Sequence, residues 1–322
     1  MGGILAFLGR DETYARWLRD LADLEVPDGG VVLPPADELP ALLVDLAVPH
    51  EDVNGVVGLL ESVRDDPDWR WLLGRCAASV FTDPEAVGGG SRIPRLPEGL
   101  GEAGRWWAAF VFVVALPRAR ELHRARGIPE KVTRRTFADL GRQVVVHRLR
   151  RGMGGVNSPS WLGLHLRGEL FQLGRLQYQR SRLSTRWLPV RAGEPSLALH
   201  IPDFCGPLSP AACDASLARA REFFSRHFPE EHCALTHCES WLLDPQLSQY
   251  LPVNSNILGF QRRFRLAPRP DRPNDDAPVR YVFGLSDVDP ADLPRRTSLE
   301  RAVGDHLRAG RHWYEGRGWF AL

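Results

Sequence analysis

The residues best suited to chemistry gather between positions 197 and 250. Within twelve residues lie five possible metal ligands: His227, His232, Cys233, His237 and Cys238. Neighbouring side chains of a strand point to opposite faces, so His237 and Cys238 could not reach one ion together. The same alternation places His237, Glu239 and Trp241 on one face. We therefore expect no metal site, and we expect a histidine and a carboxylate that share one face.

A second candidate precedes these residues. Residues 197–201 (LALHI) predict a strand, and the segment DFCGPLS leads from it into a helix that begins at Pro210. The start of a helix presents unpaired N–H groups and a partial positive charge, which suit an anion such as a diphosphate. Every strand, turn and helix in sequence has this feature, so an ordinary structural turn is the alternative.

The elements that must position these residues fall into two groups. Apolar residues spaced by three and four predict five early helices, at 11–24, 38–47, 54–63, 67–80 and 105–126. Residues 87–104 are rich in glycine and proline and predict an irregular linker. The pattern restarts after Pro129. We therefore expect an all-helical domain over residues 1–128 and a second domain over residues 129–322.

The second domain is expected to be α+β. Further helices are predicted at 136–151, 207–228, 244–250 and 297–309, and Ser209 and Pro210 are typical residues for the start of the second. Two-residue alternation from Trp161 onward (LGLHLRG, ELFQLGRLQYQRS) predicts successive antiparallel strands. Later strands are expected at 233–243, 256–266 and 313–322, with a disordered loop at 268–278.

The composition is that of an ordinary globular protein. Of 322 residues, 43% are hydrophobic and 25% are charged, which excludes wholesale disorder and a disulfide-stapled miniprotein. The five cysteines are expected to be reduced thiols. The most apolar stretch, 108–116, is too short to cross a bilayer, and the N-terminus lacks the basic start of a signal peptide. We expect a cytoplasmic protein with no membrane span.

The net charge of +1 conceals strong segregation along the chain. Residues 1–103 hold 19 acidic and 8 basic residues, whereas residues 104–191 hold 4 acidic and 18 basic residues. The basic segment could bind an anionic partner, or the two segments could neutralise each other. Its arginines lack a recognised nucleic-acid motif, so no nucleic-acid partner is expected.

Four blocks of the sequence resemble one known family: LHLRGELFQLGRLQYQR (164–180), LHIPDFCGPLSPAACDASLARAREFFSRHFPEE (199–231), THCESWLLDPQLSQYLPVNSNILGFQRRFRL (236–266) and TSLERAVGDHLRAGRHWYEGRGW (297–319). They are similar to the actinobacterial acyltransferase family, in which a helical N-acyltransferase N-terminal domain precedes a GNAT-like C-terminal domain. The resemblance implies an α+β fold whose mixed, mostly antiparallel sheet is flanked by helices. It also implies N-acyl transfer from a coenzyme A or acyl carrier protein thioester to an amine. Acyl-CoA would be a co-substrate, with no permanently bound cofactor.

The resemblance further implies where the donor binds. In a GNAT domain the fourth and fifth strands splay apart around the pantetheine arm, and the helix after the fourth strand receives the diphosphate. Residues 197–201 match the fourth strand, 205–209 the diphosphate loop and 233–242 the fifth strand. The implied donor-binding residues are Leu199, Ile201, Cys205, Gly206, Leu208 and Ser209. Only Gly206 remains of the usual Gln/Arg-x-x-Gly-x-Gly/Ala signature, so weaker coenzyme A binding and a carrier-protein donor stay open.

Acyl transfer to an amine needs a base, a polarised thioester carbonyl and an acid for the leaving thiolate. Glu239 is the first candidate for the base and His237 the second; a solvent-facing carboxylate and a structural histidine are the alternatives. Tyr250, ahead of Leu258-Gly259-Phe260, looks like the GNAT tyrosine that protonates the thiolate. A nucleophilic Cys205 or Cys238 would form an acyl-enzyme, but direct attack is expected for this fold.

Two further expectations concern partners. The acceptor, a small-molecule or peptide amine, is expected to bind between the two domains, where the acidic helical domain would attract a cation. The competing hypothesis is a catalytically inactive GNAT-like binding or regulatory protein. In that case the arginines between residues 135 and 182 would hold an anionic partner, in a manner sensitive to salt.

Overall fold

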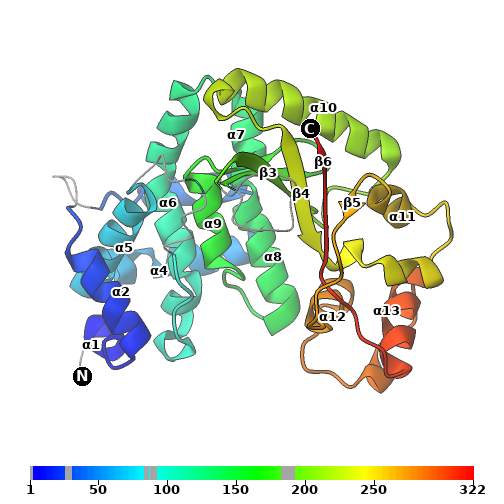
Figure 1. Ribbon diagram of the computed structural model, residues 1–322. Helices are drawn as coiled ribbons and strands as arrows, with labels where there is room; N and C mark the ends of the chain where they lie inside the picture. The colour runs from blue at the N-terminus through cyan, green and yellow to red at the C-terminus, as the bar shows by residue number, and fades with distance from the viewer. Residues whose placement is uncertain (1–2, 26–30, 83–86, 88–92, 183–192) are drawn as a thin grey trace. The chain divides into compact units, whose positions relative to one another are not determined.

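The chain folds into two compact units, residues 1–171 and residues 172–322 (Figure 1). The computed structural model describes residues 3–25, 31–82, 87, 93–182 and 193–322. The boundary falls after Phe171 and not near residue 128, because the helices that follow residue 128 pack into the first unit. The backbone N–H of Gly141, for example, donates to the carbonyl oxygen of Leu46 at 3.1 Å.

Among its described residues, the first unit consists of helices and loops, except for the first two residues of strand β1 (Leu170–Gln172) at its end. Its helices are α1 (Ile4–Leu8), α2 (Glu12–Ala22), α3 (Leu39–Asp45), α4 (His50–Asp65), α5 (Pro67–Val80), α6 (Gly101–Ala125), α7 (Glu130–Phe137), α8 (Asp139–Arg151) and α9 (Pro159–Leu166), with a 3₁₀ turn η1 (Glu98–Leu100). Asp11 caps α2 by accepting from the N–H of Thr13, and Asp66 caps α5 ahead of a first-position Pro67. The early helices thus form as their caps and periodicity predict.

Helix α6 is the central helix of this unit. Its side chains from Trp106 to Val113 are buried in one cluster with residues of α4 and α5. By length and composition the stretch 98–125 could cross a membrane, but most of it is buried inside the unit. Such burial is typical of a core helix, and the absence of a membrane span stays a prediction. Residues 88–92 of the expected linker lie outside the described residues, and α6 begins at Gly101, inside that linker.

Ion pairs within the first unit join acidic residues of the first segment to basic residues of the middle segment. Asp45 accepts from Arg120 at 3.1 Å and from Arg134 at 2.6 Å. Asp52 pairs with Arg148, with Nε and Oδ2 3.1 Å apart. Acidic side chains of the first segment therefore neutralise basic side chains of α6, α7 and α8, as the second of the two sequence alternatives expects.

The second unit contains most of a six-stranded mixed sheet. The strands are β1 (Leu170–Gln172), β2 (Gln177–Arg182), β3 (Pro195–His200), β4 (Leu235–Ser240), β5 (Arg265–Leu266) and β6 (Gly316–Ala321), in the order β1-β2-β3-β4-β6-β5. Strand β3 is parallel to β4, and the other registered pairs are antiparallel. The chain passes from one unit to the other within β1.

Four α-helices and four 3₁₀ turns of the described residues surround the strands of the second unit. They are α10 (Pro210–His227), α11 (Asn256–Gln261), α12 (Asp276–Phe283) and α13 (Ser298–Arg308), with 3₁₀ turns η2 (Pro229–Glu231), η3 (Trp241–Leu243), η4 (Pro245–Gln249) and η5 (Pro290–Asp292). Helix α10 runs along one face of β3 and β4 (Figure 1), where its Phe224 ring packs against Tyr178 of β2. Thr297 and Glu300 form a reciprocal capping box at the start of α13.

Three predicted elements are wrong. Residues 159–166 form helix α9 and not a strand, because Pro159 occupies the first helical position and the buried Leu162 and Leu166 recur at helical spacing. Residues 256–261 form α11, capped by Ser255, so only Arg265–Leu266 remain of the expected strand. The expected disordered loop ends in a helix, since α12 begins at Asp276.

Candidate active site

Strands β3 and β4 separate after a short parallel pairing. Their register contains only Leu197 with Thr236 and Ala198 with His237 among the described residues. Beyond that point β3 stays paired with β2 as far as His200, and β4 stays paired with β6 as far as Ser240. The carboxyl ends of the two strands therefore diverge, and a gap with unpaired backbone groups opens in the middle of the sheet.

Strand register assigns side chains to the two faces of this gap. Opposed residues of a ladder share a face, and the face alternates along each strand. One face is packed under α10 and carries Tyr178, Leu197 and Leu199. The other face is polar and carries Gln179, His200, His237, Glu239, Arg317 and Trp319. We call these six residues the polar face.

His237 of the polar face is mostly buried. Burial lowers the pKa of its imidazole, and the negative charge of Glu239 opposes that shift only in part. The side chain is therefore neutral at physiological pH, which is the form that accepts a proton.

Glu239 has a different environment two residues further along β4. Its Oε1 accepts a hydrogen bond from Nε of Arg317 at 2.6 Å, and the two residues face each other across β4 and β6. Its side chain is 42% exposed. The structure thus brings both predicted base candidates to one face and pairs the carboxylate with a guanidinium.

His200 was missed by the sequence interpretation, which treated LALHI as donor-binding strand. It is the last residue of β3, where the gap begins, and its Nε2–H donates to Oε1 of Gln179 at 2.9 Å. That hydrogen bond puts the lone pair of the neutral imidazole on Nδ1. The β3 to β4 register places His200 on the same face as His237, because Ala198 is paired with His237 and His200 follows Ala198 by two residues.

Tyr250 belongs to a separate cluster that contains Trp313 and Leu247. Nε2 of His306 lies 3.1 Å from the carbonyl oxygen of His312 and therefore carries the proton. Nδ1 of His306 then accepts from the Tyr250 hydroxyl at 2.9 Å. The Tyr250 ring also contacts Trp313 and Arg311. Its assignment as the acid stays a prediction.

The predicted donor-binding residues follow β3 in order. Leu199 is buried on the α10 side and Ile201 leads into a loop that ends at the cap of α10. Gly206 has a φ of 78° with open space at the position of a Cβ atom, so the loop turns there in a conformation that favours glycine. Ser209 caps α10 by accepting from the N–H of Ala212 at 3.3 Å. Cys205 and the buried Leu208 lie on either side of that turn.

The remaining candidates are the cysteines of β4 and its approach and the possible metal ligands. Burial raises the pKa of the Cys238 thiol, and it raises that of Cys233 to about 12, so both stay protonated. Among the described residues, no three His, Cys, Asp or Glu side chains gather as a group that could hold a metal ion.

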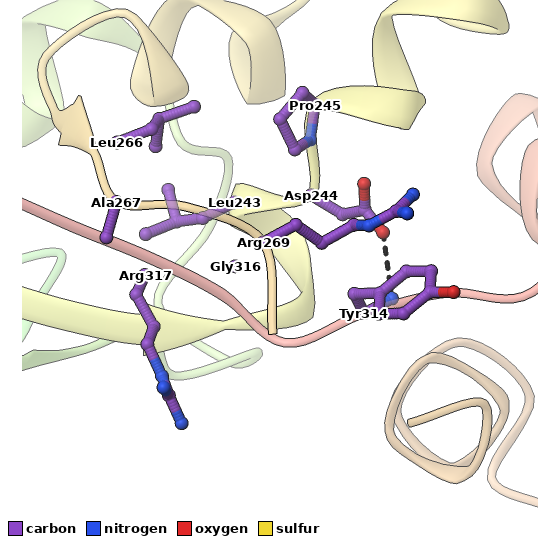
Figure 2. Close-up of a pocket in the computed structure, with 9 residues that line it drawn as sticks. All are labelled: Leu243, Asp244, Pro245, Leu266, Ala267, Arg269, Tyr314, Gly316 and Arg317. Carbon is purple, nitrogen blue, oxygen red and sulfur yellow. Dashed lines mark hydrogen bonds between the residues drawn. The ribbon is translucent and has the colours of Figure 1, made fainter. Parts of the chain in front are cut away.

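A small pocket borders the polar face at Arg317 (Figure 2). It is lined by Leu243, Asp244, Pro245, Leu266, Ala267, Arg269, Tyr314, Gly316 and Arg317. Figure 2 shows the N–H of Tyr314 donating to Asp244, at 2.8 Å, and the Arg317 side chain directed away from Arg269. The predicted catalytic residues are not among the lining residues, so this pocket is a neighbour of the candidate site.

Comparison with known proteins identifies the family. The family described as "N-acyltransferase N-terminal domain" matches residues 37–168, and the "GNAT-like C-terminal domain" matches residues 170–320. The chain is also similar, with a TM-score of 0.90 in each case, to crystal structures of acyltransferases that are 38–39% identical and aligned over 98% of both chains. One is a variant in complex with octanoyl-CoA, one is in complex with decanoyl-CoA and teicoplanin, and one is in complex with CoA and 10C-Teicoplanin. No curated protein sequence matches the chain.

This chain belongs to that two-domain acyltransferase family. The predicted family, the α+β fold class and the acyltransferase activity are confirmed. The two family matches meet at residues 168–170, close to the boundary between the compact units of the acyltransferase. The roles of individual residues in this acyltransferase stay predictions.

Proposed function

We propose that this acyltransferase moves a medium-length acyl chain from acyl-CoA to an amine of a small-molecule acceptor similar to teicoplanin. The structurally similar acyltransferases support the donor, since they bind octanoyl-CoA and decanoyl-CoA. Their complexes also support the acceptor: decanoyl-CoA with teicoplanin and CoA with 10C-Teicoplanin correspond to the two sides of one ten-carbon transfer.

The divergence of β3 and β4 is the observation that carries this proposal. A pantetheine arm is a slender amide-containing chain, and a gap lined by unpaired N–H and C=O groups can hydrogen-bond it as a strand would. The diphosphate then lies at the loop before α10, where the N-terminal amides and the helix dipole favour negative charge. The thioester is thereby held next to the polar face of the gap.

The chemical step is a direct displacement. The acceptor nitrogen forms a bond to the thioester carbonyl carbon, and the C–S bond breaks. A base on the polar face takes the proton that the nitrogen loses, and the departing thiolate of CoA takes a proton from an acid. The raised pKa of Cys238 is unfavourable for the alternative acyl-enzyme, because a protonated thiol is a weak nucleophile.

The candidates for the base are His237, His200 and Glu239, and they differ in their surroundings. His237 is neutral, so its imidazole can accept a proton, and His200, held through Nε2 by Gln179, is the second histidine on the same face. Glu239 shares its carboxylate with Arg317. Tyr250 is the candidate acid, with His306 holding its hydroxyl in one direction.

An assay with defined substrates tests the proposed activity. Purified protein is mixed with decanoyl-CoA and teicoplanin, thiol release is followed with a disulfide reagent, and the product is weighed by mass spectrometry. We expect CoA release that requires acceptor and a product heavier by one decanoyl group less one hydrogen. An acceptor whose amines have been acetylated is the matched control and should release no CoA.

The same assay decides between this activity and the inactive binding protein. The ion pair with Asp52 already occupies Arg148, which is one of the arginines that the binding hypothesis requires for an anionic partner. If no thioester from eight to twelve carbons were consumed, and the protein bound nucleic acid in a salt-sensitive manner, the binding hypothesis would replace the proposed function.

A further inference from the structure

We infer that Arg175 is a positioning residue for the donor: it holds the loop of residues 202–207 in the shape that receives the diphosphate and supplies a positive charge beneath it. This inference rests on the proposed function, in which that loop binds acyl-CoA. Arg175 lies in the turn between β1 and β2, far from the loop in sequence. Neither motif nor periodicity connects the two segments.

The turn that carries Arg175 is fixed on both sides. Nε2 of Gln172 donates to the carbonyl oxygen of Gly174 at 2.7 Å. On the other side, the Ser216 hydroxyl of α10 donates to the carbonyl oxygen of Leu173 at 2.6 Å and accepts from the N–H of Leu176 at 3.1 Å. Three hydrogen bonds thus hold the four-residue turn, so the backbone that carries the Arg175 side chain is fixed in place.

The guanidinium reaches both ends of the loop. One Nη donates to the carbonyl oxygen of Pro202 at 2.7 Å, and Nε donates to the carbonyl oxygen of Pro207 at 3.3 Å. The residues between these anchors are Asp203, Phe204, Cys205 and Gly206, and Phe204 is 45% exposed. Because a guanidinium only donates hydrogen bonds, these two carbonyl oxygens are the groups by which Arg175 fixes the loop ends.

The charge of Arg175 is buried without a carboxylate. Its side chain is only 7% exposed, and within the described part of the chain its hydrogen bonds go to backbone carbonyl oxygens. Arg180 on the next strand is equally buried but has a carboxylate partner in Glu231, whose two oxygens accept from Nε of Arg180 at 2.9 and 3.0 Å. Asp203, Cys205 and Cys213 are the titratable groups that act on Arg175, and Asp203 is exposed. A buried cation of this kind is stabilised by an anion bound to the loop above it.

The test compares two acyl donors, one with and one without the diphosphate part that the loop held by Arg175 would bind. Decanoyl-CoA has the diphosphate, whereas decanoyl-pantetheine has the same thioester and arm without it. For Arg175→Gln we expect the KM for decanoyl-CoA to rise about tenfold or more with kcat within about twofold, as for the loss of hydrogen bonds from a charged group. The KM for decanoyl-pantetheine and that for teicoplanin should stay unchanged. Arg175→Lys keeps the charge and one contact, so its KM should lie between the two.

A matched control comes from the same unit. Arg301 donates to the carbonyl oxygens of Arg295 and Arg296 at 3.1 and 3.2 Å, which is the same kind of contact at the start of α13. Arg301→Gln should leave the KM for decanoyl-CoA unchanged. Equal losses with both donors in Arg175→Gln, or no loss with either, would overturn the inference. Wild-type protein that is inactive with both donors would instead overturn the proposed function, and calorimetric titration of CoA into wild type and Arg175→Gln would still decide the role of Arg175.

Discussion

His237 and Glu239 lie two residues apart on one strand face, yet their environments suit different tasks. Burial keeps His237 neutral, so its lone pair is available to an ammonium or amine proton at physiological pH. The carboxylate of Glu239 is held by Arg317, and transfer of a proton to it would weaken that ion pair. The geometry therefore favours His237 over Glu239, which reverses the order that the sequence suggests.

The pH dependence of kcat/KM tests this order. A base works only when unprotonated, so a lowered pKa for His237 predicts that activity persists below pH 6.5 and declines only at more acidic pH. We expect His237→Gln to reduce kcat/KM by about 10²-fold or more and to remove that acidic limb, and Glu239→Gln to reduce it less than about fivefold. Rates of CoA release between pH 5 and 9 give both profiles. An unaltered acidic limb in His237→Gln would transfer the role to His200, for which the same profile is then the measurement.

Long helices with capping residues and clear periodicity are predicted well from the sequence. Short elements whose pattern fits both a helix and a strand are not. Helices α2, α5 and α10 begin at capping residues and are long enough for their periodicity to be read. The eight residues of α9 alternate Trp161, Gly163 and His165 with leucines, a pattern that fits a strand equally well until tertiary packing selects the helix. The same limit applies to the site. The β3-loop-α10 unit is local and was predicted, whereas His200 and Arg175 acquire their places through strand register and a long-range contact.

Two glycines in helices provide a matched prediction about packing between elements. A Cβ on Gly141 of α8 would lie 1.9 Å from the carbonyl oxygen of Ala47, which is backbone and cannot turn away. Gly58 of α4 has no described atom within 4 Å of its Cβ position. We expect Gly141→Ala to lower the free energy of unfolding by about 2–3 kcal/mol and Gly58→Ala to raise it by about 0.5–1 kcal/mol. Urea titration measures both, and a loss of stability in Gly58→Ala would contradict this account of α4.

At the scale of the whole chain, the charge pattern has a structural explanation. The acidic first segment and the basic middle segment as far as residue 171 lie in the same compact unit, and Asp45, Asp52 and Glu98 pair with arginines of α6, α7 and α8. A run of residues with the same charge in the sequence therefore need not form a binding surface for a partner of opposite charge. What the sequence could not show is which helices would lie together, and so which charges cancel.

Burial separates the ion pairs that matter for stability from those that do not. The Asp52 side chain is 1% exposed where it meets Arg148, whereas the Glu98 side chain is 89% exposed where it meets Arg151. Asp52→Asn is expected to lower the free energy of unfolding by about 2 kcal/mol, because it leaves a partly buried guanidinium without its counter-charge. Glu98→Gln should change it by less than about 0.5 kcal/mol. Denaturation curves for the two variants decide the matter, and similar losses in both would refute the distinction.

The gap between β3 and β4 also bears on how this protein avoids association with itself. Two strand edges with unpaired backbone groups face each other there, and such edges are where a foreign strand can add and start aggregation. Proteins discourage this with charged and polar side chains at the exposed edge. His200, His237 and Glu239 lie at this gap. The residues proposed for proton transfer are therefore also expected to oppose the addition of a foreign strand. Replacing them with apolar residues would therefore cost solubility as well as turnover.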